Sequence, residues 1–198
     1  MLPYESTIAH RLTNGEKEYL SYDFATLPNP FDIKIAEKNL LSVKKILDDL
    51  AIPFWLQFGT CLGAVRDGAL IPHDRDVDLG LYKDIVEQEI FYDALLAFQD
   101  IGFEIIRTAY KDDLITILRD KVYIDFYSIT KVNYNSTWTW GPCIEEDYYS
   151  KLADISFLDT TFQTPSPVLE WLEARYGKTW RTVIKGQRAT VLRDKNYE

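Results

Sequence analysis

A short acidic run that leads directly into an apolar segment constrains this chain most. Residues 71–80 read Ile-Pro-His-Asp-Arg-Asp-Val-Asp-Leu-Gly, so three carboxylates fall within five positions. If residues 77–79 lie on a strand, Asp76 and Asp78 project from the same face, with Cα atoms about 6–7 Å apart. Like charges that close repel unless a cation lies between them. Mg²⁺ prefers carboxylate oxygen and accompanies phosphate substrates into sites, so the sequence points to phosphate chemistry.

A glycine-threonine pair lies upstream of the acidic run, at the end of a short apolar segment. Residues 54–58 read as a strand, and residues 61–66 as a helix. Glycine at such a junction lets the backbone approach a ligand closely, so Gly59 is predicted to line the site. Thr60 is predicted to cap the helix, whose N-terminus would attract phosphate. Strand, turn, helix and acidic strand together predict a phosphate cradle beside a metal site.

A further carboxylate stands alone in a later apolar segment. Residues 122–129 are rich in β-branched and aromatic side chains and predict a buried strand, in which Asp125 is the only charge. A lone buried carboxylate is costly unless it is paired, protonated or bound to a metal. Taken alone, Asp125 fits equally well a core residue that accepts backbone hydrogen bonds. Beside the strand of Asp76 and Asp78, it would complete a metal site of three carboxylates.

The remaining pattern predicts one mixed sheet backed by helices, an α/β (α+β) fold. Helical spacing of apolar residues is found from Asp32 to Leu50 and from about Asp84 to Ile101. The expected buried sides are Ala36, Leu40, Val43, Leu47 and Leu50 in the first helix, and Val86, Ile90, Ala94, Ala97 and Ile101 in the second. Further strands are expected over 103–108 and 114–119, with turns at 112–113 and 120–121.

The C-terminal third predicts smaller elements. Residues 137–142 are either a short strand or an aromatic loop, and residues 157–162 resemble a hairpin. A helix is expected from Pro167 to Tyr176, capped by Ser166 and ended by Gly177.

Length and composition fit a single globular domain. The chain has 198 residues, 46% of them apolar and 27% charged, which suffices for a full core. Residues 1–30 have no clear period and are predicted to be a lead-in to one domain over 31–198. The net charge of −9 argues against nonspecific nucleic-acid binding. With no apolar run of membrane-spanning length, no signal-like N-terminus and only two cysteines, we expect a cytoplasmic protein without an integral membrane segment.

Three other interpretations of these motifs are weaker. A calcium loop of the EF-hand type counted from Asp74 would need Gly and Glu where the chain has Leu79 and Ile85. A nucleophile elbow at Cys61 would need a histidine late in the chain, whereas both histidines lie in its first half. An acidic turn on a solvated surface would leave the upstream glycine-threonine pair and Asp125 without a common explanation.

The acidic and glycine motifs together resemble the LicD/fukutin-related family of the nucleotidyltransferase-fold superfamily. That superfamily has a hydrophobic-Gly-Gly/Ser motif, then Asp-x-Asp/Glu, then an Asp on a later strand. Residues 176–180 resemble the family's C-terminal Tyr-Gly-x-x-Trp signature. Arg75 departs from the family, which usually has Asp there, and His73 stands where an aromatic residue is common. The matching positions are Gly59, Thr60, Arg66, Asp74, Asp76, Asp78, Tyr176, Gly177 and Trp180.

The resemblance implies an enzyme with a mixed sheet flanked by helices. It implies transfer of a phospho-substituted group, such as phosphocholine, from a cytidine-diphosphate donor to a sugar or glycan hydroxyl. Asp76, Asp78 and Asp125 would hold Mg²⁺ (or Mn²⁺), and Asp125 would accept the proton of the attacking hydroxyl.

The other expected site residues surround this centre. Gly59 and Thr60 would cradle the donor phosphate beside Asp74, and Arg66 would clamp two phosphate oxygens, unless it is a surface helix residue. Arg75 either pairs with Asp74 or faces the donor. Two other functions stay open: a nucleotidylyltransferase that moves NMP from an NTP to a small molecule or protein, and a non-catalytic nucleotide- or metal-binding module.

Overall fold

The structure is a computed structural model. The residues that it describes are 26–28, 31–86, 88–109, 114–129 and 148–183. Almost all of the predicted lead-in lies outside them, as do the turn expected at 112–113 and the aromatic segment at 137–142. A single domain over 31–198 therefore stays a prediction.

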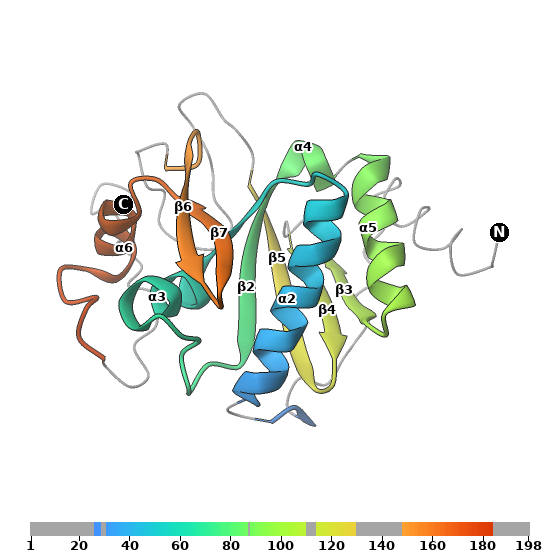
Figure 1. Cartoon of the computed structure of the whole chain (residues 1–198), viewed down its shortest axis with the longest axis horizontal. Coiled ribbons are helices and arrows are strands. Elements are labelled where there is room, and N and C mark those ends of the chain that lie inside the picture. The colour runs from blue at the N-terminus through green and yellow to red at the C-terminus, as the bar shows by residue number, and fades with distance from the viewer. Residues whose placement is uncertain (1–25, 29–30, 87, 110–113, 130–147, 184–198) are drawn as a thin grey trace, which may run out of the picture.

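The centre of the fold is the predicted mixed sheet, with five strands in the order β1-β2-β5-β4-β3. Strands β2, β5, β4 and β3 are labelled in Figure 1. Strands β2 and β5 pair in parallel, and the other neighbouring strands pair antiparallel. The bounds are Phe54–Leu56 for β1, Asp76–Tyr82 for β2, Glu104–Ala109 for β3, Leu114–Arg119 for β4 and Val122–Ile129 for β5. The strands predicted after residue 103 are confirmed, apart from the ends of β3, and so is the turn at 120–121, where both residues have positive φ.

A separate two-stranded sheet is formed by β6 (Leu152–Phe157) and β7 (Thr160–Pro165). Its turn is made by Leu158 and Asp159, which have φ of 50° and 57°. The predicted hairpin is confirmed. The ring of Phe162 in β7 lies edge-on to that of Phe54 in β1, with ring centroids 6.2 Å apart. The hairpin therefore packs beside the edge of the central sheet.

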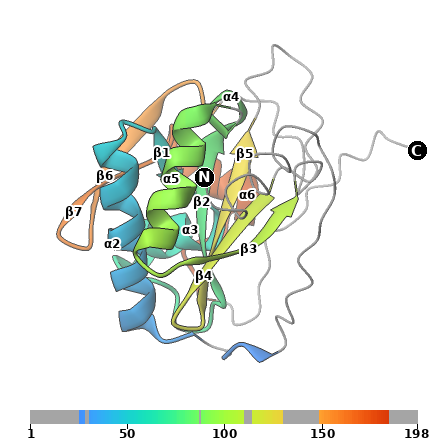
Figure 2. The ribbon, with the colours of Figure 1, turned by 90° about the vertical axis from the view of Figure 1, so that its right-hand side faces the viewer.

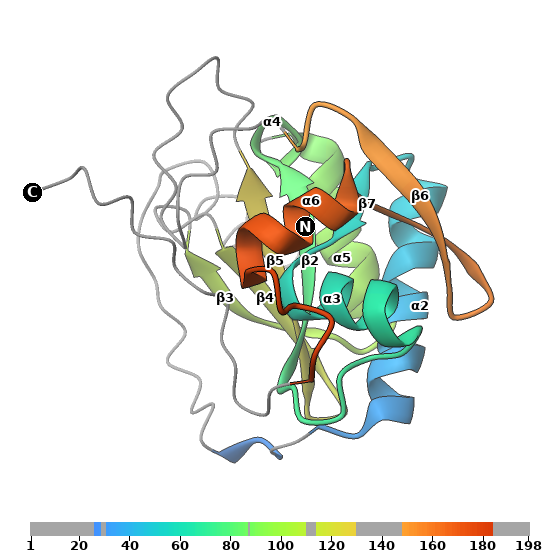
Figure 3. The same ribbon diagram turned by 90° about the vertical axis from the view of Figure 1, so that its left-hand side faces the viewer.

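Helices lie on both sides of the central sheet. In Figure 2, α2 and α5 stand in front of the strands, whereas the opposite view in Figure 3 has α3 and α6 in front. The bounds are Ile33–Asp49 for α2, Phe58–Asp67 for α3, Lys83–Val86 for α4, Glu89–Asp100 for α5 and Val168–Tyr176 for α6. In the part of the chain that is described, no helix combines the length and apolar character needed to cross a membrane.

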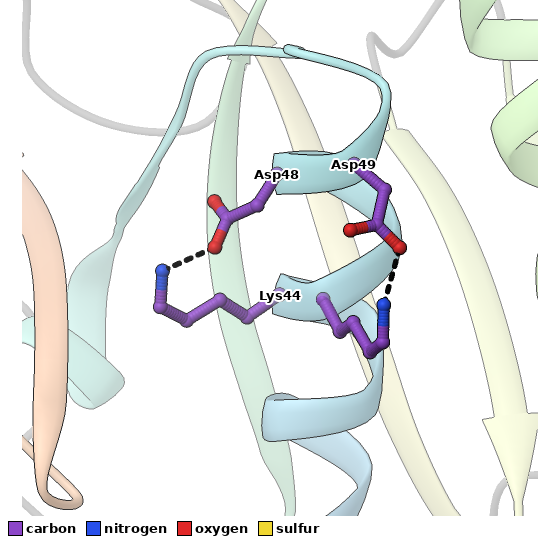
Figure 4. Close-up of polar contacts among 4 residues, drawn as sticks. Lys44, Asp48 and Asp49 are labelled. Carbon is purple, nitrogen blue, oxygen red and sulfur yellow. Dashed lines mark hydrogen bonds and ion pairs between the residues drawn. The ribbon is translucent and has the colours of Figure 1, made fainter.

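Helix α2 agrees with the prediction. Asp32 caps it by accepting hydrogen bonds from two backbone N–H groups of the first turn. The predicted stripe is buried, except that Leu50 is half-buried at the C-cap. On the outer side, Lys44 pairs with Asp48 at 2.6 Å one turn on, as Figure 4 shows.

The second predicted helix is wrong in two respects. It is divided into α4 and α5, and Ile90 and Ala97 are half-buried while Ile101 is 42% exposed. Val86 and Ala94 are buried as predicted, and the other buried residues of α5 are Phe91, Leu95 and Phe98. This stripe has the same helical period, and it is favoured because phenylalanine rings bury more area: Phe98 stacks on Phe126 of β5 with centroids 5.8 Å apart.

The cap of α6 also differs from the prediction. The N-cap is Pro167, which makes no side-chain hydrogen bond, so Ser166 is not the cap. The predicted C-cap is confirmed, since Gly177 has φ of 80° and donates its N–H to Glu173.

Candidate metal centre

The three predicted carboxylates converge on one face of the central sheet. Asp76 and Asp78 lie two residues apart on β2, and Asp125 lies directly opposite Asp78 in the parallel pairing with β5. One carboxylate oxygen from each of them lies within 4.8 Å of the others. The predicted reach of Asp125 to the pair is thereby confirmed. We call the side of the sheet that carries these carboxylates the acidic face.

Burial makes three negative charges costly at this place. Asp78 is 7% exposed and Asp125 is 4% exposed. Burial raises the pKa of Asp125 to about 7, against a hydrogen bond from Thr116 that lowers it. Burial, followed by the charges of Asp76, Asp125 and Asp74, raises the pKa of Asp78 well above its usual range. Carboxylates in this arrangement need protons or a cation as partners.

The donor set fits a hard divalent cation. All three candidate ligands are carboxylates. Asp76 is half-buried, beside the buried Asp78 and Asp125, and its pKa is also raised mainly by burial. Mg²⁺ and Mn²⁺ favour such oxygen ligands, and a cation between the carboxylates would offset their mutual repulsion. The residues present therefore fit the expected metal, whose identity they do not specify.

Gly59 lies directly against this centre. Its backbone N–H donates to Oδ2 of Asp78 at 3.2 Å. A Cβ atom at this position would lie 2.6 Å from Oδ2 of Asp74, closer than real Cβ contacts. Burial raises the pKa of Asp74 to about 6, with a further contribution from Asp76 and an opposing one from Arg66. The absence of a side chain at Gly59 thus leaves room for the carboxylate of Asp74 beside that of Asp78. The backbone N–H of Gly59 is already bonded to Asp78.

Thr60 does not cap α3, contrary to the prediction. The helix begins earlier, at Phe58, with Gln57 as an N-cap that makes no side-chain bond. Thr60 therefore lies inside the first turn, where its hydroxyl accepts a hydrogen bond from the backbone N–H of Asp78 at 2.8 Å. This bond fixes the start of α3 against β2, so Thr60 supports the position of a predicted metal ligand.

The two arginines predicted beside the site have protein partners. Arg66 donates to Asp67 through Nε at 3.0 Å and through a terminal nitrogen at 2.6 Å. The charge of Arg75 lowers the pKa of Asp76. Arg66 lies close enough to Asp74 to lower its pKa, but its contact with a donor phosphate stays a prediction.

Three hydroxyl groups that sequence reasoning missed bond to the carboxylates. Thr116 of β4 donates a very short hydrogen bond to Asp125. Tyr123 bonds to Asp76, and Tyr127 bonds to Asp125. The alternation of strand residues contains a signal for the tyrosines, since positions two before and two after Asp125 share its face.

Two further arginines were also missed. Arg175 of α6 is 5% exposed, and its guanidinium carbon lies 4.3 Å from the ring centroid of Phe58. Burial lowers the pKa of Arg175, and the charge of Asp78 is among the groups that raise it. Arg107 of β3 lowers the pKa of both Asp76 and Asp125. Arg175 directly precedes the Tyr176-Gly177 motif, which was a signal in the sequence. No sequence feature singled out Arg107.

Cys61 and the C-terminal aromatic residues Tyr176 and Trp180 belong to the core. Cys61 is fully buried, and burial raises the pKa of its thiol. Tyr176 is 5% exposed and Trp180 is 3% exposed. The nucleophile-elbow interpretation therefore finds no support in the environment of Cys61.

Comparisons with known proteins agree with this geometry. A family profile described as "LicD/FKTN/FKRP, nucleotidyltransferase domain" matches residues 51–167. The chain is 34% identical over 166 residues to the ribitol-5-phosphate transferase FKTN of Homo sapiens, covering 77% of this chain and 34% of that protein. It is 28% identical over 144 residues to the ribitol 5-phosphate transferase FKRP of Homo sapiens, covering 67% of this chain and 29% of that protein. The chain thus spans about a third of the length of these curated relatives.

A solved structure shows a shared fold. The solution structure of the antibiotic-resistance factor ANT(2'')-Ia aligns with a TM-score of 0.50, over 68% of this chain and 67% of that chain. Sequence identity is 12%, so the likeness concerns the fold alone. It agrees with the predicted mixed sheet flanked by helices.

Proposed function

We propose, from the premise that the chain belongs to the LicD/FKTN/FKRP nucleotidyltransferase family, that it is a metal-dependent transferase. In this proposal it moves a phospho-substituted group from a cytidine-diphosphate-type donor to a hydroxyl of a sugar or glycan. The observation that carries the proposal is the convergence of Asp76, Asp78 and Asp125 on one face of the sheet. This arrangement fits a transferase better than a passive scaffold, because three carboxylates so placed are costly without a function.

Asp76, Asp78 and Asp125 would hold Mg²⁺ or Mn²⁺. Bound there, such an ion would offset negative charge on the donor phosphates and on the leaving group. Gly59 and Thr60 would hold Asp78 in position through the two hydrogen bonds described above. Gly59 and Thr60 would then act on the donor phosphate indirectly, by holding the metal ligand Asp78 in place.

The transfer itself needs one bond made and one broken at phosphorus. The acceptor hydroxyl oxygen would bond to the phosphorus of the transferred group, and the bond from that phosphorus to the CMP oxygen would break. CMP would leave with the bonding electron pair, and Asp125 would take the hydroxyl proton. Arg66, near Asp74, and Arg75, near Asp76, would bind the donor phosphates.

Two transferred groups are compatible with this proposal. The names of the relatives specify ribitol 5-phosphate, whereas the motif resemblance also implies phosphocholine. Both are phospho-substituted alcohols, so the same metal centre would serve either.

The direct test is release of CMP from a cytidine-diphosphate donor. The chain would be incubated with Mg²⁺ and either CDP-choline or CDP-ribitol, in the presence of simple sugar acceptors, with EDTA as the control. CMP release that depends on the metal supports the proposal. Absence of CMP from both donors, in a preparation shown to be folded, contradicts it.

The two alternative functions give different products. A nucleotidylyltransferase would release pyrophosphate from an NTP and leave CDP donors intact. A non-catalytic module would bind metal and nucleotide without turnover of either donor class. The same incubations with NTPs, read for pyrophosphate, separate the three possibilities.

The expected location is a separate prediction. A cytoplasmic protein is what the sequence favours, and cell fractionation with an antibody against the chain would test it.

A further inference from the structure

A row of polar side chains crosses the central sheet on the acidic face. In the pairing of the strands, Asp78 lies opposite Asp125, Asp125 lies opposite Thr116, and Thr116 lies opposite Arg107. Residues directly opposite one another in a sheet project from the same face. Arg107 of β3 therefore shares the acidic face with the carboxylates, at the end of the row that begins with Asp78.

An irregularity in β3 is what turns Arg107 to this face. The pairing runs from Ile105 opposite Ile117 directly to Arg107 opposite Thr116, so Ile106 is an extra residue in a β-bulge. In regular pairing Arg107 would lie opposite Ile115, which is 5% exposed and part of the apolar core. Bulges next to functional sites often serve to re-aim a side chain. Here the bulge moves a cation from the core side to the side of the carboxylates.

Arg107 lies on the acidic face near Asp125, and its side chain is not fully buried. In the register of the sheet, only Thr116 stands between Arg107 and Asp125. The side chain of Arg107 is half-buried, whereas Thr116, the next member of the row, is fully buried. Arg66, the arginine expected from the sequence to clamp phosphate, instead makes a bidentate pair with Asp67.

We propose that Arg107 contacts a phosphate group of the nucleotide-linked donor, an inference that rests on the function proposed above. Its planar guanidinium presents two parallel N–H donors, which match two oxygens of one phosphate. Arg107 stands at the end of the row beyond Asp125 and Thr116, so the phosphate would lie between the carboxylates and β3. Arg107 is thus a binding residue, and its counter-charge effect on the carboxylates is secondary.

The test separates phosphate contact from simple charge compensation by measuring two affinities. Arg107→Gln and Arg107→Lys would be titrated with CDP and with inorganic pyrophosphate, each in saturating Mn²⁺, and with Mn²⁺ alone by electron paramagnetic resonance. Lys45→Gln is the control, since it removes one exposed positive charge from α2, against the other face of the sheet.

We expect Arg107→Gln to weaken CDP and pyrophosphate about tenfold or more, as loss of charged hydrogen bonds does. Mn²⁺ alone should bind as tightly as in the wild type or more tightly, because a positive charge beside its ligands is gone. Arg107→Lys should lie between the two, since it keeps the charge and loses the fork. The control should match the wild type in every titration.

Several outcomes overturn the inference. Unchanged CDP and pyrophosphate affinity, within twofold, with tighter Mn²⁺ binding means that Arg107 only compensates charge. Weaker binding of Mn²⁺ alone means that the residue acts by holding the carboxylates in place. If Arg107→Gln fails to fold, Arg107→Lys decides by the same criteria, with weakened pyrophosphate binding as support and wild-type binding as refutation.

The proposed donor can fail separately from Arg107. If the wild type binds pyrophosphate but not CDP, the cytidine donor is wrong and the pyrophosphate titrations still decide the role of Arg107. If the wild type binds neither ligand with Mn²⁺, both the donor and the contact are refuted.

Discussion

Asp125 and Phe126 are neighbours in the chain and lie in opposite environments. Phe126 is 1% exposed and packs against two phenylalanines of α5, on what we call the apolar face of the sheet. Asp125 is 4% exposed and lies among carboxylates and hydroxyl groups on the acidic face. One step along a strand therefore separates a residue that contributes to folding from one that costs stability without a ligand. The two faces should respond in opposite ways to substitution.

The largest expected effect is on activity at the acidic face. Asp78→Asn or Asp76→Asn should lower CMP release by more than about a hundredfold, because each removes a ligand charge at the centre. Either variant should be at least as stable as the wild type in EDTA, since carboxylate repulsion is relieved. The measurements are donor turnover and thermal unfolding, and the control is Asp93→Asn, which changes an exposed carboxylate of α5. Near-normal turnover in either variant with Mg²⁺ would remove the metal assignment.

The apolar face should show the reverse pattern. Phe98→Ala removes a fully buried ring that stacks on Phe126, so unfolding should become easier by about 3–5 kcal/mol. Turnover per folded molecule should remain close to that of the wild type. Chemical denaturation combined with activity at low temperature measures both quantities. A loss of turnover that exceeds the loss of folded protein would show that the two faces are not independent.

The pH dependence of stability should carry the signature of the acidic face. In EDTA the folded-state pKa of Asp125, about 7, lies above its ordinary value, so the folded protein binds more protons than the unfolded chain between about pH 4 and 7. Stability should therefore fall as pH rises through this window, by on the order of 4 kcal/mol. Asp125→Asn or saturating Mg²⁺ should flatten the profile. A profile in EDTA that rises from pH 5 to 8 contradicts the assignment.

A smaller effect is expected from the glycine that touches the site. Gly59→Ala places a Cβ against the carboxylate of Asp74, so that side chain must move, at a cost of about 1–3 kcal/mol. Because the disturbance lies on the acidic face, Mn²⁺ affinity should fall together with stability. Titration of Mn²⁺ and thermal unfolding of the same preparation provide the check. If only stability falls, Gly59 serves packing alone.

The smallest expected effect is at Arg66. Arg66→Lys keeps the charge near Asp74 but loses the bidentate pair with Asp67, so kcat/KM should fall only about three- to tenfold. Metal affinity should stay nearly unchanged. Steady-state kinetics beside Arg107→Lys would rank the two arginines. Wild-type kinetics in Arg66→Lys would leave the phosphate contact to other cations.

Much of this fold was predictable because local patterns determine it. The β-branched and aromatic residues around Asp125 identified a buried strand, and the spacing of Asp76 and Asp78 placed both on one face. The residues of the glycine-threonine motif lie against the carboxylates, but α3 begins at Phe58, earlier than predicted. Thr60 therefore bonds to the backbone of Asp78 and not to its own helix.

The missed residues depend on contacts between distant segments. Arg107 reaches the acidic face because of a bulge, and the residues of β3 carry no pattern that fixes where an extra residue falls. Arg175 reaches Phe58 because α6 packs against α3, which no spacing within either helix specifies. Side-chain period predicts the face of a regular strand, and it fails where regularity ends.

The parallel pairing of β2 with β5 also bears on how the chain finds its fold. The two strands are separated in sequence by α4, α5, β3 and β4, so their contact is non-local, in contrast to the hairpin of β4 and β5. A slip of one residue in that pairing would carry Asp78 or Asp125 into the apolar face, where a carboxylate has no compensating partner. The same acidic residues that make the finished protein costly thus penalise misaligned sheets during folding.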